Sequence, residues 1–423
     1  MNAWLSLPLS TRMAILAVTG ACLGSFVNWL VYRWAFYPRP IGPWARPHLD
    51  APPRAWWDRL PIVGWLGLRR EAALHAELPR REFLTPTGRR FWLRPMLLEI
   101  VTAAGAVGLY WWELHGRLYP PSATPDPLDV HWQYLAHLLL LTLLLAATVI
   151  DLDEQSVPDA VTVPGTWIGH VLAACAPAML LPARFLVGTV PRVDSLLAVP
   201  RHEWPDAWNE SIGLMLGIGC FAAWCYAVAG KTCTLKHGWV KGIRYLLASL
   251  WRRNYWLGVP LMFVVGAVLI SLVWTLGGHS WQALLSSLLG VVIGGGFIWS
   301  LRVIAGSALG VEAMGFGDVT LLAMIGSFLG WQAAILTFFL APFCAIPINL
   351  FHFLLSGHSR LAFGPYLAAA ALIILVKWSA VWQSTRIYFE FAEILFGALA
   401  VSLVAMALLL ALIRPFRERM HAR

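Results

Sequence analysis

Charged residues are scarce in this sequence of 423 residues: Asp, Glu, Lys and Arg make up 13% of it, and hydrophobic residues make up 59%. An average soluble domain is about 45–50% apolar, so an ordinary soluble protein is excluded. The formal net charge of +9 would suggest nucleic-acid binding in a soluble chain. Here the basic residues cluster between hydrophobic runs, so we assign them to membrane topology and expect no nucleic-acid partner.

Paired cysteine motifs are absent as well. The six cysteines include no pair with CxxC spacing, and five of them lie in apolar runs. This pattern supports neither a zinc site nor a disulfide framework, and we expect no metal. A small-residue cleavage site is also lacking after the first hydrophobic run, 13–34. That run is therefore interpreted as a retained membrane anchor rather than a signal peptide.

Long apolar runs dominate what is present. Because a spanning helix needs about 20 mainly apolar residues, the sequence predicts an all-α, polytopic integral membrane protein with about eleven transmembrane helices. The predicted spans are 13–34, 96–112, 134–150, 161–181, 212–229, 256–276, 283–305, 319–329, 333–355, 365–376 and 391–412. The eighth and tenth are short, and half-helices or partial insertion are expected there.

Basic residues accumulate in alternate loops, as the positive-inside rule requires. The stretch 36–94, the loop 231–253 and the C-terminal tail are rich in Lys and Arg, so all three are predicted to face the cytoplasm. The loop 113–133 has one Arg among several acids and is placed outside, together with the N-terminus. The loop 182–210 is also placed outside, although its three Arg residues, offset by four acids, weaken that assignment.

Acidic residues beside the spans are the most informative ones, because an Asp at mid-bilayer costs about 2.5–3.5 kcal/mol on insertion scales. Asp151 directly follows the apolar run 138–150, so desolvation acts on it more than on the later acids of its loop. Asp318 opens the eighth predicted span, and Gly315 and Gly317 allow a sharp bend and a close backbone approach. On the predicted topology both carboxylates lie at the cytoplasmic face.

Two carboxylates brought together share a proton, because like charges at close range raise one pKa strongly. Such a pair can activate water against a peptide carbonyl. The residues alone leave two alternatives open: a cation or proton site in a transporter, and helix capping, which is favoured for Asp159 after Pro158. Asp153 and Glu154 are interpreted as solvated residues or as residues that hold the loop.

Several ordered segments resemble the signatures of the type IV prepilin peptidases. The segments and their letters are 150–153 IDLD with 157–164 VPDAVTVP, 312–331 EAMGFGDVTLLAMIGSFLGW, 24–33 GSFVNWLVYR and 363–368 FGPYLA, with weaker similarity at 60–66 LPIVGWL and 94–99 RPMLLE. Ordered motifs over this length of chain are far more specific than a lone GxGD.

The resemblance implies an intramembrane aspartyl endopeptidase that removes the basic leader from type IV prepilins or pseudopilins, just before their hydrophobic helix. It implies that Asp151 and Asp318 are catalytic. We expect Asp153, Asp159, Gly315 and Gly317 to be supporting residues. Neither a metal nor a covalent intermediate is needed. The protein is expected in the inner, cytoplasmic membrane as a multi-pass protein, with prepilin-like substrates and the lipid bilayer as partners and its active site facing the cytoplasm.

The sequence also departs from the family. The stretch 36–94 lacks the two CxxC pairs that are typical of it, so methylation of the new amino terminus with S-adenosylmethionine is open. Thr320 stands where the family usually has Lys. The helix pair 212–276 looks inserted, and the last span looks additional. We divide the chain into N-terminal spans with a cysteine-free loop (1–110), a peptidase core (130–380) and a C-terminal span with a basic tail (381–423).

Rival functions are a transporter or a catalytically inactive membrane adaptor that keeps the acids for ion binding or structure, although no inverted repeat is evident. Among enzymes, the alternative is the wider GxGD class of proteases, but the PAL motif of that class is absent from this sequence. Phe363-Gly364-Pro365 stands there instead and is expected to shape a helix entrance. The glycines at 290 and 294–296 are interpreted as helix-packing residues, and Asn28 needs a buried partner.

Overall fold

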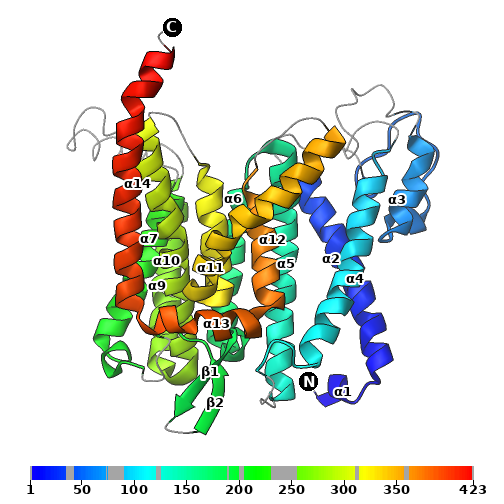
Figure 1. Ribbon diagram of the computed structural model, residues 1–423. Coiled ribbons are helices and arrows are strands. Elements are labelled where there is room, and N and C mark those ends of the chain that lie inside the picture. The colour runs from blue at the N-terminus through cyan, green and yellow to red at the C-terminus, as the bar shows by residue number, and fades with distance from the viewer. Residues whose placement is uncertain are drawn as a thin grey trace. The chain divides into compact units, whose positions relative to one another are not determined.

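The computed structural model describes residues 2–34, 42–72, 74, 90–120, 125–187, 190–199, 204–229, 255–309, 314–356 and 362–421, and it is almost entirely helical (Figure 1). The predicted all-α class is confirmed. The basic loop 231–253 lies outside the described residues. Two compact units are present, Met1–Thr162 with Thr337–Ser379 and Val163–Leu336 with Ala380–Arg423, and each is described by itself.

The first unit contains the N-terminal helices. Its elements are α1 (Asn2–Leu5), α2 (Leu9–Trp34), the 3-10 turn Trp56–Arg59, α3 (Val63–Leu68), the 3-10 turn Arg69–Glu71, α4 (Leu93–Leu114), α5 (Pro127–Glu154), the start of α6 (Asp159–Cys175), the second part of α11 (Phe316–Ser356), α12 (Gly364–Val376) and the start of α13 (Trp378–Glu390). Helices α2 and α4 pack closely at Gly20, which has no side chain. A Cβ added there would lie only 2.7 Å from the Thr102 carbonyl oxygen. Helix α5 begins where Asp126 accepts the Leu128 N–H at 2.8 Å, which satisfies one of the free donors of the first turn.

The second unit contains the remaining elements. They are the rest of α6, the 3-10 turn Pro177–Met179, β1 (Pro182–Val187), β2 (Val190–Ser195), the 3-10 turn Asp206–Trp208, α7 (Ser211–Val228), α9 (Tyr255–Leu276), α10 (Gly278–Leu309), the first part of α11, most of α13, and α14 (Ala392–His421). The two strands form an antiparallel hairpin in register from Pro182↔Ser195 to Val187↔Val190, which the sequence analysis did not predict.

Helices α10 and α11 approach at glycines. A Cβ added at Gly290 would lie 2.1 Å from the Gly326 carbonyl oxygen, and one added at Gly326 would lie 2.2 Å from the Gly290 carbonyl oxygen. No side chain fits at either position without moving a backbone. The packing role predicted for Gly290 is therefore confirmed, and Gly326, in the second signature, is its partner.

The LGW end of the second signature anchors a loop of the same unit. Trp331 donates its indole N–H to the Ala198 carbonyl oxygen at 2.8 Å. Gln332 donates to the Leu197 carbonyl oxygen at 2.9 Å. These buried bonds attach the segment after β2 to the middle of α11, at the point where Gly330 breaks the helix with φ 83°.

The predicted count of about eleven spans is not confirmed. Within the described ranges, eight helices are long and apolar enough to cross a membrane, or nine if α12 and α13, bent by 96°, form one broken span. The predicted spans 319–329 and 333–355 both fall in α11, on either side of the break at Gly330. The predicted span 161–181 corresponds to α6, which has only 17 residues.

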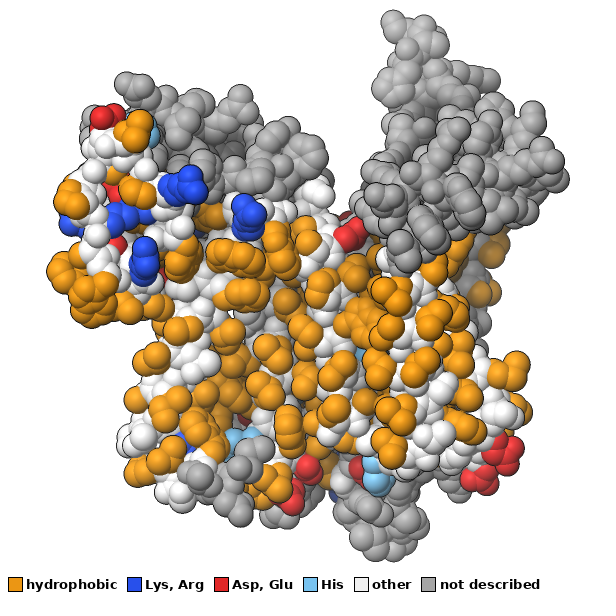
Figure 2. All heavy atoms as spheres, turned by 180° about the vertical axis from the view of Figure 1, so that it is seen from behind, with side chains coloured by type: hydrophobic (Ala, Val, Ile, Leu, Met, Phe, Trp, Pro, Cys, Tyr) orange, Lys and Arg blue, Asp and Glu red, His pale blue; other side chains and the backbone are white. Residues whose placement is uncertain are grey.

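The surface agrees with a membrane environment. Figure 2 shows hydrophobic side chains over most of one face, and Lys and Arg side chains gathered at one end of it. Large apolar side chains of α14, such as Val401 and Leu408, are exposed at 69% and 63%. Such surface is costly in water and is satisfied by lipid.

Candidate functional site

Asp151 lies in the last turn of α5 and is buried, with 4% of its surface exposed. Its Oδ2 accepts a hydrogen bond from the backbone N–H of Gly364 at 3.0 Å. A buried carboxylate is tolerated only where polar groups stabilise it. The structure thus places this Asp at a position where a hydrogen-bond donor holds its orientation.

Gly364 begins α12, as the expected helix entrance requires, and it also contacts Asp151. A Cβ added at Gly364 would lie 2.5 Å from Oδ2 of Asp151 and 3.1 Å from a methyl group of Val157. Only glycine brings its backbone N–H this close to the carboxylate. The sequence analysis missed this role, although the Gly-Pro pair at a helix start marked the position.

Asp153 is held by an ion pair with Arg94 of α4. The two Arg94 nitrogens lie 2.7 and 3.1 Å from the two carboxylate oxygens, and Arg94 also donates to the Val149 carbonyl oxygen at 3.3 Å. A bidentate pair of this kind fixes geometry as well as charge. It ties the end of α5, beside Asp151, to the start of α4, and Arg94 was not predicted to take part.

Asp159 is exposed at the first position of α6. A carboxylate there interacts favourably with the positive end of the helix dipole. This position agrees with the capping interpretation.

Asp318 is in the first turn of α11 and is buried, with 8% exposed. The helix begins at Phe316, so Gly317 is helical, and neither Gly315 nor Gly317 has the positive φ that only glycine adopts readily. A Cβ added at Gly315 would lie 3.7 Å from Oδ2 of Asp318, an ordinary contact. Arg302 holds the preceding segment by donating to the Met314 carbonyl oxygen at 2.9 Å.

Asp151 and Asp318 lie in different units, so their pairing stays a prediction. The first residues of the second signature, 310–313, lie outside the described residues. Within the described ranges no group of three or more His, Cys, Asp or Glu side chains is arranged to hold a metal ion.

Three of the shorter motifs meet at one buried carboxylate, Glu99 of α4. Ser25 donates to it at 2.7 Å, Asn28 at 3.1 Å and the Trp65 indole at 2.8 Å, and the Ile62 backbone N–H is a fourth donor. Asn28 also donates to the Pro95 carbonyl oxygen at 2.9 Å, which confirms its need for a buried partner. The network joins α2, α4, α3 and the residue before α3.

The fold and these residues define a multi-pass helical membrane protein with buried carboxylates at helix ends. Residues 254–350 match the type IV leader peptidase family. The match covers α9, α10 and most of α11, including Asp318.

Three curated relatives, all named prepilin leader peptidase/N-methyltransferase, are similar to the chain. The Pseudomonas aeruginosa protein is 37% identical over 25% of this chain and 37% of its own length. The Aeromonas hydrophila protein is 33% identical over 31% of this chain and 44% of its own length. The Stutzerimonas stutzeri protein is 23% identical over 89% of this chain and 93% of its own length.

The matched part of the chain thus spans less than half the length of the first two relatives. No solved structure matches the chain. The chain is thus similar to the type IV leader peptidase family over residues 254–350, and to one relative over most of its length at lower identity.

Proposed function

We propose that this protein is an intramembrane aspartyl endopeptidase that removes the basic leader peptide from type IV prepilins or pseudopilins. The observation that carries the proposal is the buried Asp151, oriented by the Gly364 N–H, in a chain whose family match contains the buried Asp318. By the resemblance of the two signatures, Asp151 and Asp318 correspond to the family's catalytic pair.

The proposed chemistry needs only the two carboxyl groups and water. One carboxylate takes a proton from water, whose oxygen bonds to the peptide carbonyl carbon. The other carboxyl group gives its proton to the carbonyl oxygen, which forms a tetrahedral diol. The first Asp then gives the proton that it took from water to the amine nitrogen, the second takes a proton back from a hydroxyl of the diol, and the carbon–nitrogen bond breaks. One Asp is the base and the other the acid, so the proposal requires the two side chains to share one proton.

The active site is proposed to face the cytoplasm. On the topology that the positive-inside rule predicts, the carboxyl-terminal end of α5 and the start of α11 lie on that side, together with the basic stretch 36–94. A substrate whose basic leader stays inside, and whose apolar helix enters the membrane, presents the bond at this face.

The test is cleavage of a prepilin by membranes that contain the wild type, Asp151→Asn or Asp318→Asn, with the amount of each protein measured. We expect cleavage by the wild type and a loss of about 100-fold or more in each variant, because positioned acid–base groups contribute about 10²–10⁴-fold. Full activity in either variant would contradict the assignment of that residue.

The alternative is a transporter or an inactive adaptor that uses the same acids for ions or structure. It would gain support if the wild type cleaved no prepilin while both Asp→Asn variants changed proton or cation flux in vesicles. No cleavage together with unchanged flux would favour the adaptor.

N-methylation is a second proposed activity, supported by the names of the relatives. A cavity of about 690 Å³ in the segment before α3 is lined by Trp44, Trp56, Arg54 and Asp58 among others. Aromatic rings stack on an adenine, so Trp44 and Trp56 fit the adenine of S-adenosylmethionine, which supplies a methyl group when bound. Asp58 is 1% exposed and paired with Arg70 at 2.6 Å, so it shapes the cavity wall instead of offering a free carboxylate. We expect Trp44→Ala to weaken the binding of S-adenosylmethionine, measured directly, while leader cleavage is retained.

A further inference from the structure

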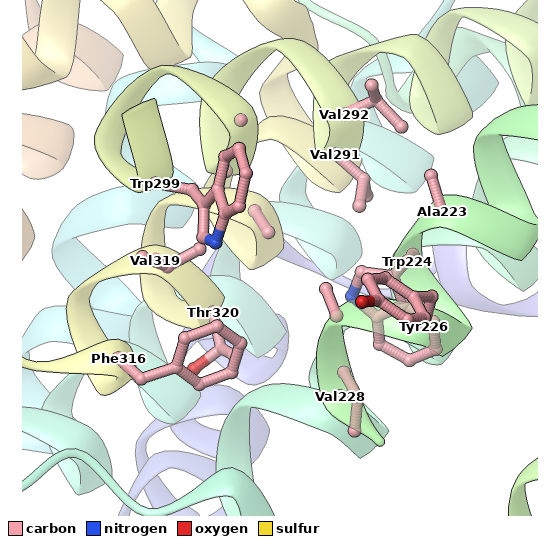
Figure 3. A pocket seen from close by; sticks show the side chains of 14 residues that line it. Ala223, Trp224, Tyr226, Val228, Val291, Val292, Trp299, Phe316, Val319 and Thr320 are labelled. Carbon is pink, nitrogen blue, oxygen red and sulfur yellow. The ribbon is translucent and has the colours of Figure 1, made fainter. Parts of the chain in front are cut away.

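A cavity of about 230 Å³ opens beside the start of α11 (Figure 3). Its wall comes from the carboxyl-terminal part of α7, the middle of α10 and the first two turns of α11. Trp224 and Tyr226 lie across it from Phe316, Val319 and Trp299. All of these residues belong to the second unit, and the cavity is much larger than the ~30 Å³ share of one water.

The cavity adjoins Asp318 along the chain. Phe316, Val319 and Thr320, which surround that residue in the first turns of α11, all line it. Thr320 is 3% exposed and donates its hydroxyl to the Gly317 carbonyl oxygen at 3.0 Å. Because Thr stands here in place of the Lys typical of the family, the wall beside Asp318 carries no ammonium group and is almost wholly apolar.

One wall residue has an unused hydrogen-bond donor. Trp224 is 5% exposed, and within the part of the chain that the structure describes its indole nitrogen has no hydrogen-bond partner. In Figure 3 this nitrogen lies on the side of the ring towards Phe316 and Thr320. A buried donor without a partner is destabilising, so a ligand that offers an acceptor gains a bond there.

A substrate of the proposed reaction needs both an apolar cavity and a hydrogen-bond donor. A peptide bond inside a helix is closed to attack, so the bond that is cut, at the start of an apolar helix, has to be in unwound chain. Unwinding leaves backbone carbonyl groups without partners at membrane depth, which is costly unless the protein supplies donors. The residues after the cut also carry apolar side chains, which an apolar cavity buries.

We propose that this cavity binds the apolar residues on the carboxyl side of the cut, and that the Trp224 indole N–H donates to a carbonyl oxygen of that unwound segment. The inference rests on the proposed peptidase function and makes Trp224 a substrate-binding residue. It also gives α7, the first helix of the predicted inserted pair, a role in substrate selection.

The first test fills the cavity. Gly296 lines it, and a Cβ added there meets no described atom within 4 Å, so Gly296→Leu places a side chain in the space. Gly219→Leu on α7 is the matched control, because its added Cβ also meets nothing within 4 Å and it does not line the cavity. We expect Gly296→Leu to raise KM for prepilin about 10-fold or more, and Gly219→Leu to leave KM unchanged.

The second test examines contact directly. A photo-crosslinking amino acid at position 292, in the Asp318→Asn background so that the substrate stays intact, is expected to label prepilin in its first apolar residues. Trp224→Phe keeps a ring and removes the donor, and we expect it to raise KM up to about tenfold with a smaller change in kcat.

The outcomes separate the two proposals. If the wild type cleaves prepilin while Gly296→Leu has an unchanged KM and position 292 labels only lipid, the cavity is a lipid site and the inference is overturned, but the peptidase function stands. If the wild type cleaves no prepilin, both proposals are overturned. A raised KM together with labelling of the substrate supports the cavity as the binding site.

Discussion

The backbone N–H of Gly364 donates a hydrogen bond to Oδ2 of Asp151 at 3.0 Å, across a separation of 213 residues. It joins the start of α12 to the end of α5 within one unit. A backbone donor cannot rotate away as a side chain does, so the carboxylate is held by the fold itself. The FGPYLA segment therefore positions the buried carboxylate as well as starting a helix.

Gly364→Ala is expected to impair leader cleavage. Its methyl group would lie 2.5 Å from Oδ2 of Asp151, so the carboxylate or α12 has to move. Because a displacement of ~1 Å costs about 100-fold in rate, we expect a loss of that order in kcat, measured on prepilin in membranes.

Gly108→Ala is the control for that change. It adds the same methyl group to α4 of the same unit, where no described atom lies within 4 Å of it. We expect full activity. Normal cleavage by Gly364→Ala would show that the contact with Asp151 has no part in the reaction.

Asp153→Asn is expected to lower stability more than activity. The substitution weakens the bidentate pair with Arg94, and hydrogen bonds to charged groups contribute about 1.5–3 kcal/mol. Thermal unfolding in detergent should show a lower Tm, while cleavage by the folded protein persists. Loss of cleavage at an unchanged Tm would instead place Asp153 in the reaction.

Glu99→Gln is expected to destabilise the first unit. An amide NH₂ would face some of the donors that now converge on the carboxylate, from Ser25, Asn28 and Trp65. Leaving buried donors without an acceptor costs about 1–3 kcal/mol. Ser25→Ala removes a single donor and should cost less, so equal Tm values for the two variants would argue against the network.

Gly326→Leu is expected to prevent α10 and α11 from packing. The added side chain would start 2.2 Å from the Gly290 carbonyl oxygen, which is backbone and cannot turn aside. We expect the variant to fail to accumulate in membranes. Gly397→Leu, on α14 where the added Cβ has open space, should accumulate normally. Equal amounts of the two would contradict the close approach.

Local sequence was enough to predict the helical membrane class and the carboxylates of interest. Apolar runs of spanning length have few other uses, and an acid beside such a run is costly enough to be noticed. The count of spans was less predictable, because hydropathy does not register a break such as Gly330 or the 96° bend between α12 and α13. The β1–β2 hairpin was missed since short apolar segments suit helix and strand alike.

The sequence by itself determined the class and the family resemblance, and it singled out Asp151 and Asp318 as the candidate pair, because these depend on composition and on residues close together along the chain. Only the tertiary structure decided which distant groups contact the carboxylates. Gly364 donates to Asp151, Arg94 pairs with Asp153, and several donors meet at Glu99. The physical reason is that a buried polar group requires a partner but does not specify which one. Helix packing makes that choice, by bringing together residues that the chain order keeps far apart.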